Sequence, residues 1–585
     1  MQVESWRQRS GLYVVLIAAV LQGWALYALH IALRDDLQIT NWIVFPALYV
    51  LAVFTPLTLQ LLAQYAQRPF MWLLVLGLSA VFFAVAWHQS SLRLPGVGPS
   101  FPFNTLVPAA AALTLLWLHA LPFMQARLLR GRWRPRYPDL FAASWRNVLV
   151  LLEAAVFTLA LWALLFLCAQ LFVLLDIDFF RELFREPLFI YPISALTFGL
   201  AIHLIGSLDR IVSVVLDQVL SLFKWLGLVA GLILMIFSVA LLTRLPQLVA
   251  TGTRTIGAHW LLWLVALTVL LLNAAWRDGG VLNPYPRVLG NALRCAVPLL
   301  LPVALIALFS LVVRADTYGL TVQRVWGFVV AAIALAYALG YFLAALRGGQ
   351  WLASLGSTNV AVALAFMVLM LLFLTPPLSP QRLTASSQYA RVLAAVNDRA
   401  AGEALRTLRF ETGTYGREKL QELQRLVEHP RAQSIRAEAT RMLTLGEGDR
   451  FGRPVATSPA QMDASLDALR IYPSGRKLDA SLRAALRNQE LAVFLRDDRW
   501  VGLFLNVNDT PAEEFVILSP YLSLLFRQAG DVWEKADASF AAIGIEHWDS
   551  TIAALALGEV SAQPTQWQDL HIGALTLPVA RPASR

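Results

Sequence analysis

Long apolar segments alternate with short polar ones through residues 11–376, and from the Pro376–Pro380 segment onward the chain is polar. An apolar run of about 20 residues can cross a hydrocarbon core of roughly 30 Å as a helix. Repeated runs predict a helical bundle, because lipid offers backbone amides no hydrogen-bond partners. The eleven predicted spans are 11–33, 42–63, 70–87, 105–124, 148–174, 188–206, 224–243, 257–275, 294–313, 325–346 and 358–376.

Two boundaries in this pattern have more than one interpretation. The first span follows Arg7 and Arg9, as a signal peptide would, but it is too long for one, and we predict a retained helix. Residues 209–223 carry a broad apolar side. They predict either an interfacial helix on the membrane surface or a helical extension of the seventh span.

The polar part of the chain predicts a soluble α+β domain after the helical membrane bundle. Residues 377–489 read as its helical part, with apolar residues at helical spacing in 416–430 and a partner helix at 431–443. Residues 490–585 read as its β-rich part, because apolar, β-branched and aromatic residues alternate there. The predicted strands are 491–498, 500–508, 513–519 and 570–579, with a hairpin turn at 508–511.

Composition supports the division and excludes some functions. The hydrophobic fraction of 58% and mean hydropathy of +0.60 exceed the roughly 45–50% apolar content of soluble domains. The net charge is +10 over residues 1–379 and −1 over residues 380–585. Because the positive excess lies beside membrane helices, we expect it to set orientation, with no nucleic-acid partner. Cys168 and Cys295 both fall in apolar segments and predict neither a disulfide nor a zinc site.

The basic residues predict an orientation in the bilayer. A cytoplasmic N-terminus places 15 Lys and Arg residues on the cytoplasmic side and 8 on the other. The loop of residues 125–147 is the most basic, and positive residues in short loops stay in the cytoplasm. With an odd number of spans, the C-terminal domain lies outside the cytoplasm. One span more or fewer would reverse that conclusion.

Two ionisable residues lie inside predicted spans. A carboxylate within a membrane is costly, so Glu153 is a candidate proton or cation site. It also lies about two turns from the cytoplasmic end, near Arg146, where snorkelling or an ion pair explains it. His203 is a candidate titrating group near neutral pH, or a hydrogen-bonded packing residue.

The loop between the ninth and tenth spans is the strongest candidate for a specific site. Two guanidiniums flank an acid there, and a glycine permits close approach of the backbone, so the loop could bind a phosphate or carboxylate head group. The alternative is a tight, salt-bridged turn that docks against the soluble part. The residues concerned are Arg314, Asp316, Tyr318, Gly319, Thr321 and Arg324.

Two further acidic patterns are weak. Asp35 and Asp36 follow the first span, where lipid-dependent glycosyltransferases place a base or metal ligand, but a loop of about eight residues is too short for such a site. An exposed charged cap is the simpler interpretation. A loose calcium-loop pattern lacks its glycine and has its last acid too early, so we predict no metal site and no cofactor. Its residues are Asn506, Asn508, Asp509 and Glu514.

Three stretches in one order resemble a known family. They are RADTYGLTVQR (314–324), PLSPQRLTASSQYARVL (377–393) and LRTLRFETGTYGREKLQEL (405–423). The chain is similar here to the bacterial polytopic membrane proteins of the domain of unknown function 4153. The resemblance runs from the basic loop to about residue 428 and implies a bacterial inner-membrane location. The family has no assigned activity, so the resemblance leaves the function open.

Three classes of function remain. The favoured one is a non-enzymatic envelope protein, whose bundle anchors in the lipid bilayer a periplasmic domain that binds an envelope protein or cell-wall component. A transporter or flippase needs a polar path, and only a few polar residues are available inside the spans. A lipid-dependent membrane glycosyltransferase is weakened by its short first loop. The intramembrane polar residues are Glu153, Gln170, His203 and Asn273.

Overall fold

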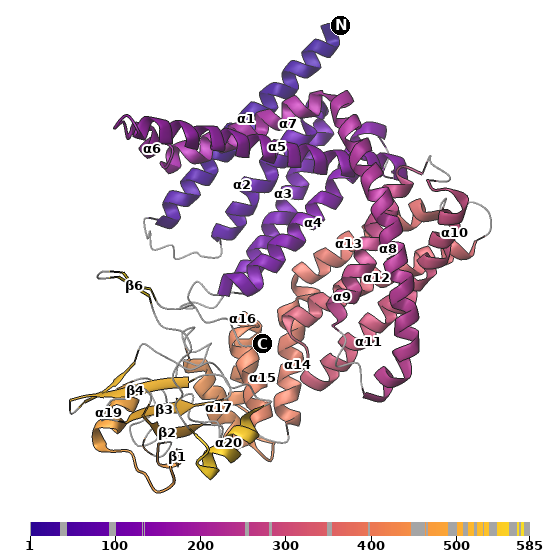
Figure 1. Ribbon diagram of the computed structural model, residues 1–585. Coiled ribbons are helices and arrows are strands. Elements are labelled where there is room, and N and C mark those ends of the chain that lie inside the picture. Colours follow the sequence, from indigo (N-terminus) through magenta and orange to yellow (C-terminus); the bar gives the residue numbers. More distant parts are fainter. Residues whose placement is uncertain are drawn as a thin grey trace. The chain divides into compact units, whose positions relative to one another are not determined.

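The computed structural model is largely helical, and the chain forms two compact units, Met1–Glu447 and Gly448–Arg585 (Figure 1). Each unit is described by itself. The structure describes residues 2–34, 44–92, 101–131, 133, 135–251, 257–279, 284–347, 354–395, 398–445, 463, 466–488, 500–506, 513–519, 523–530, 532–536, 547–560, 570–572 and 575–577.

The membrane bundle confirms the predicted spans. Within the described ranges, 11 helical segments are long and apolar enough to cross a membrane, and each coincides with one predicted span. The helices are α1 (Gln2–Arg34), α2 (Val44–Leu62), α3 (Pro69–Ser91), α4 (Phe101–Arg130), α5 (Tyr137–Val173), α6 (Phe179–Leu183), α7 (Pro187–Ser207), α8 (Asp209–Thr251), α9 (Ala258–Trp276), α10 (Arg287–Ala296), α11 (Leu300–Tyr318), α12 (Val322–Leu346) and α13 (Leu355–Leu374).

Small residues allow these helices to pack closely, as is usual in membranes. A Cβ atom added to Gly199 of α7 would lie 2.8 Å from the Cβ of Ala19 in α1. One added to Gly340 of α12 would lie 2.2 Å from Thr358 Cγ2 in α13. Neither position can take a larger side chain without moving its neighbour, so these glycines fix helix spacing.

The helix α8 decides between the two interpretations of residues 209–223. These residues form one continuous helix with the seventh span, so they extend it and are not a separate interfacial helix. One contact holds this extension to the bundle, and a second holds the start of the seventh span. Asp217 pairs with Arg277 at 2.7 Å, and the Tyr285 hydroxyl donates to the Lys224 carbonyl at 2.7 Å.

Four helices after the last span form a helical subdomain within the first unit. They are α14 (Pro380–Ala394), α15 (Asp398–Phe410), α16 (Gly413–Gln424) and α17 (Ala432–Thr444). Their apolar faces share one core that includes Leu408, Leu420 and Ile435. The change from apolar to polar sequence at residue 376 is therefore not the end of the compact unit, which continues through Glu447.

The second unit is built on a five-stranded sheet of order β1-β2-β3-β4-β5. Only β1 and β2 pair in parallel. Alternate residues of the strands face opposite sides, so α19 (Ala480–Asn488) shares a core with one face and α20 (Trp548–Leu557) with the other. The strands are β1 (Arg470–Tyr472), β2 (Val501–Leu505), β3 (Glu514–Leu518), β4 (Ser523–Ala529) and β5 (Val532–Lys535).

The strand predictions hold in part. The predicted hairpin at 500–519 is present as β2 and β3, whereas its turn and the predicted strand at 491–498 lie outside the described residues. The stretch 570–579, predicted as one strand, forms the short hairpin β6 (Leu570–Ile572) and β7 (Leu575–Leu577). In addition, β1 lies within the segment predicted to be helical, and α20 within the segment predicted to be β-rich.

Candidate functional site

The predicted loop at 314–324 is a tight turn between α11 and α12. Gly319 ends α11 with φ 71° and ψ 174°, a conformation that is open almost only to glycine. Thr321 is the N-cap of α12, and its hydroxyl oxygen accepts the Arg324 backbone N–H at 3.3 Å. Both helix ends are therefore closed within a few residues.

The helix α14 of the helical subdomain packs directly on this turn. The backbone N–H of Leu320 donates to Ser387 Oγ at 3.0 Å, and Gln388 Nε2 donates to the Leu320 carbonyl at 2.7 Å. A Cβ atom on Gly319 would lie 2.5 Å from Arg391 Cδ. Both main-chain groups of Leu320 are thus satisfied by α14, and glycine at 319 allows that approach.

Arg324 of the loop and Arg391 of α14 bind backbone carbonyls of the turn. Arg324 Nη1 donates to the Gly319 carbonyl at 2.6 Å, and Arg391 of α14 donates to the Tyr318 carbonyl. Arg314 lies close enough to the Arg324 guanidinium to repel it. Asp316 is exposed and forms no ion pair with a described residue. The expected arrangement of two guanidiniums around an acid is therefore not formed, and the contacts are those of a docking turn.

A second contact joins the helical subdomain to the bundle at the end of α3. The backbone N–H of Thr414 donates to the Leu92 carbonyl at 3.0 Å. Nearby, Gln89 Nε2 donates to the carbonyl of Leu374, the last residue of α13, at 2.9 Å. The subdomain is therefore hydrogen-bonded to two ends of the bundle that are far apart in sequence.

No hydrogen bond or ion pair between described residues joins the two intramembrane candidates, although α5 and α7 pack together around Ala154 and Ile202. Glu153 in α5 and His203 in α7 are both half-buried, and neither forms a hydrogen bond or ion pair within the described ranges. Arg146, the suggested partner of Glu153, instead donates to the Gly206 carbonyl at 2.6 Å. The contacts of Glu153 and His203 thus show no proton path between them.

The remaining acidic candidates lie mostly outside the description. Asp35, Asp36, Asn508 and Asp509 are not among the described residues. Glu514 is buried in β3, where it pairs in register with Leu505. Across the described part of the chain, no three His, Cys, Asp or Glu residues are grouped so that they could hold a metal ion.

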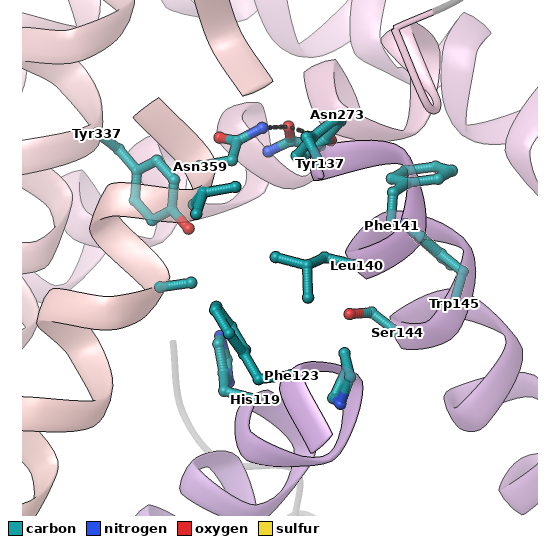
Figure 2. Close-up of a pocket in the computed structure, with 13 residues that line it drawn as sticks. His119, Phe123, Tyr137, Leu140, Phe141, Ser144, Trp145, Asn273, Tyr337 and Asn359 are labelled. Atoms are coloured by element: carbon teal, nitrogen blue, oxygen red, sulfur yellow. Dashed lines mark hydrogen bonds between the residues drawn. The ribbon is translucent and has the colours of Figure 1, made fainter. Parts of the chain in front are cut away.

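A partly open cavity of about 230 Å³ lies between α4, α5, α9, α12 and α13. Figure 2 shows His119, Phe123, Leu140, Ser144 and Tyr337 around its central space, with Phe141 and Trp145 at one edge. Aromatic side chains dominate the lining, a few polar groups interrupt it, and no charged residue belongs to it. The lining residues are His119, Pro122, Phe123, Tyr137, Leu140, Phe141, Ser144, Trp145, Asn273, Tyr337, Asn359, Val360 and Ala363.

A hydrogen-bonded network forms one wall of the cavity. Asn273 Oδ1 accepts from Asn359 Nδ2 at 2.5 Å and from the Tyr137 hydroxyl at 3.3 Å. Behind them, the buried Tyr341 hydroxyl donates to Asn359 Oδ1 at 2.9 Å. The Tyr137 ring is stacked on Trp276, with ring centroids 4.9 Å apart. Because its members satisfy one another, this wall is preorganised.

Other polar groups of the cavity can still donate or accept hydrogen bonds. The hydroxyls of Tyr337 and Ser144 face the cavity (Figure 2), and neither bonds to a described residue. His119 Nδ1 lies 2.8 Å from the Leu115 carbonyl, so this nitrogen carries the proton and Nε2 is free to accept. The cavity thus offers two hydroxyls and one acceptor nitrogen.

Sequence reasoning found only Asn273 of these residues, as one of the polar groups inside the spans. The available signal was the presence of a few asparagines and tyrosines in the otherwise apolar helices α5, α9, α12 and α13. Periodicity within one helix cannot show that such residues from separate helices converge.

Comparison with protein-family models, curated proteins and solved structures gives no match to this chain. The helices show the class of protein, because 11 of them within the described ranges are long and apolar enough to span a membrane. The chain is a multi-pass membrane protein with a soluble α+β region at its C-terminal end.

Proposed function

We propose that this protein is a non-enzymatic envelope protein of a bacterial inner membrane, whose bundle anchors and orients a periplasmic interaction region. The observation that carries the proposal is the double attachment of the helical subdomain, at Leu320 and at Leu92. A tether would be enough for anchoring alone. Hydrogen bonds to two bundle ends instead hold α14–α17 in a fixed orientation, as presentation to a partner requires.

The location rests on charge and on resemblance. The distribution of 15 basic residues on one side and 8 on the other supports a cytoplasmic N-terminus and a periplasmic C-terminal region. The order of the motifs at 314–324, 377–393 and 405–423 supports membership in the family of the domain of unknown function 4153. Two of these motifs contribute the residues that meet at the α14 contact.

The alternatives have less support. Transport through Glu153 and His203 would need a shared polar path, yet neither residue lines the cavity. A glycosyltransferase would depend on Asp35 and Asp36, whose loop is short. An envelope protein needs neither group to be reactive.

Complementation of a gene deletion tests the proposal. A chain truncated after Ser379, which lacks α14–α17 and the second unit, should insert and fail to complement, whereas full-length Glu153→Gln and His203→Gln should complement fully. Complementation by the truncation together with failure of Glu153→Gln would instead favour a transporter. Alkaline phosphatase fused after Ala385 should be active, and fluorescence of green fluorescent protein at that position would contradict the orientation.

A further inference from the structure

The cavity among α4, α5, α9, α12 and α13 has the composition of a ligand site. Small-molecule sites are mostly apolar and aromatic, with a few placed polar groups. Here Phe123, Phe141 and Trp145 provide aromatic surface, while Tyr337 and Ser144 provide hydroxyls without a described partner.

Charge and size restrict what can bind. Because no charged residue lines the cavity, a charged ligand would be desolvated without compensation, so the ligand is neutral. A cavity of roughly 150 Å³ holds benzene. The 230 Å³ here therefore suits one ring with several substituents. The cavity is partly open, which allows an attached tail to leave it.

The hydrogen-bonding groups restrict the ring further. The hydroxyls of Tyr337 and Ser144 can donate to a carbonyl or ether oxygen. His119 Nε2 can accept from a ring hydroxyl, because Nδ1 is engaged by the Leu115 carbonyl. The His119 ring is itself held against Phe366, with centroids 4.4 Å apart. The complementary ligand is an aromatic or quinonoid ring that carries oxygen substituents.

We propose that this cavity binds the ring of a neutral, oxygen-substituted amphiphile, with a quinone or quinol head group as the chemical class. The inference concerns binding alone and is independent of the proposed presentation function. Contact with Phe123 and Leu140 would hold the ring, and hydrogen bonds to Tyr337, Ser144 and His119 would select its oxygens.

The test uses full-length protein in lipid nanodiscs with decylubiquinone as the probe and decylbenzene as its matched control. Both partition into lipid, but only decylubiquinone carries ring oxygens. A ligand that binds the folded state raises the unfolding temperature, here by an expected shift of about 3 °C at saturation. Decylbenzene should produce no shift beyond its effect on the lipid.

Variants locate the site. Ala363→Phe fills the cavity and should abolish the shift, whereas Ala365→Phe, the same change at an exposed position of α13, should retain it. Tyr337→Phe removes one hydroxyl and should weaken the affinity about tenfold, the effect of one lost hydrogen bond. If Ala363→Phe fails to fold, Tyr337→Phe and Ser144→Ala decide the matter, since each removes a single oxygen.

Three results would overturn the proposal. Equal shifts of the unfolding temperature with decylubiquinone and decylbenzene would mean that the cavity binds hydrocarbon without recognising the ring oxygens. An unchanged affinity in both Tyr337→Phe and Ser144→Ala, with wild-type binding present, would place the probe elsewhere. Absence of any shift in the wild type would exclude this class of ligand.

Discussion

The turn at Leu320 and the cavity at Tyr337 contain similar polar side chains, but these are hydrogen-bonded at the turn and partly without partners at the cavity. At the turn, the serine, the glutamine and two arginines bond to main-chain groups. At the cavity, a serine and a tyrosine keep hydroxyls without a described partner. Satisfied polar groups stabilise a fold, and unsatisfied ones in a cavity are available to a ligand. We therefore infer that the turn has a structural role and that the cavity is a binding site.

The largest effect is expected at the turn. Gly319→Val places a side chain where φ is 71° and where a Cβ would lie 2.5 Å from Arg391 Cδ. Strain and displacement of α14 should together cost about 3 kcal/mol in the free energy of unfolding. Denaturant titration would measure the loss, and proteolysis near Pro376 would report release of α14.

Gly402→Ala is the matched control for that variant. Gly402 lies within α15, and an added Cβ would meet nothing within 4 Å. Alanine is the better helix former, so the control should be neutral or more stable by up to about 1 kcal/mol. Equal destabilisation by both variants would show that the approach of α14 to Gly319 has no special role.

Substitutions in the wall of the cavity should have an intermediate effect on the free energy of unfolding, because the polar groups of the wall are hydrogen-bonded to one another. Asn359→Ala removes the acceptor of the fully buried Tyr341 hydroxyl and should cost about 2 kcal/mol. Adding Tyr341→Phe should recover part of the loss, as a double-mutant cycle would reveal. The exposed neighbour Ser357→Ala should leave stability nearly unchanged. Purely additive losses would mean that the pair is not coupled.

Two serines test the comparison most directly. Ser387→Ala deprives the Leu320 N–H of its acceptor and should cost about 1 kcal/mol. Ser144→Ala removes a hydroxyl without a described partner and should change stability by less than about 0.5 kcal/mol. Thermal unfolding of the two variants side by side is the measurement. A larger loss at Ser144 would reverse the assignment of the two regions.

A pH-dependent effect separates both regions from the second unit. Burial would raise the pKa of Asp479, but hydrogen bonds from the Leu482 N–H, Ser481 and Trp533 lower it below its usual value. A lowered pKa means stability that is present above pH 3.8, the unfolded value, and lost as the pH falls through the folded pKa.

Asp479→Asn should remove this pH dependence and keep the cap of α19. Because the carboxylate is largely open to solvent, the effect should stay below about 1 kcal/mol. Hydrogen exchange of α19 between pH 2 and pH 6 would follow it. A similar change in the exchange of α14 would contradict the division into two compact units.

Hydropathy predicted the bundle well, because span length and apolarity are properties of single segments. The continuity of α8 could not be predicted, since an apolar face suits an extended helix and an interfacial one equally. The glycine at 319 indicated a close backbone approach, but nothing local identified α14 as its partner. The cavity was missed because Tyr137, Asn273 and Asn359 converge only through packing.

The length of α8 has a physical consequence for the bilayer. Its 43 residues extend about 65 Å at 1.5 Å each, roughly twice the thickness of a hydrocarbon core. Tilt alone cannot absorb the excess, so the segment near Asp217 must stand in water while Leu234 lies in the membrane-spanning part, packed in the core of the bundle. If α8 moved along its axis, the movement of its aqueous end would be transmitted directly to its membrane-spanning part. The protein therefore has a rigid mechanical link between the aqueous phase and the membrane interior.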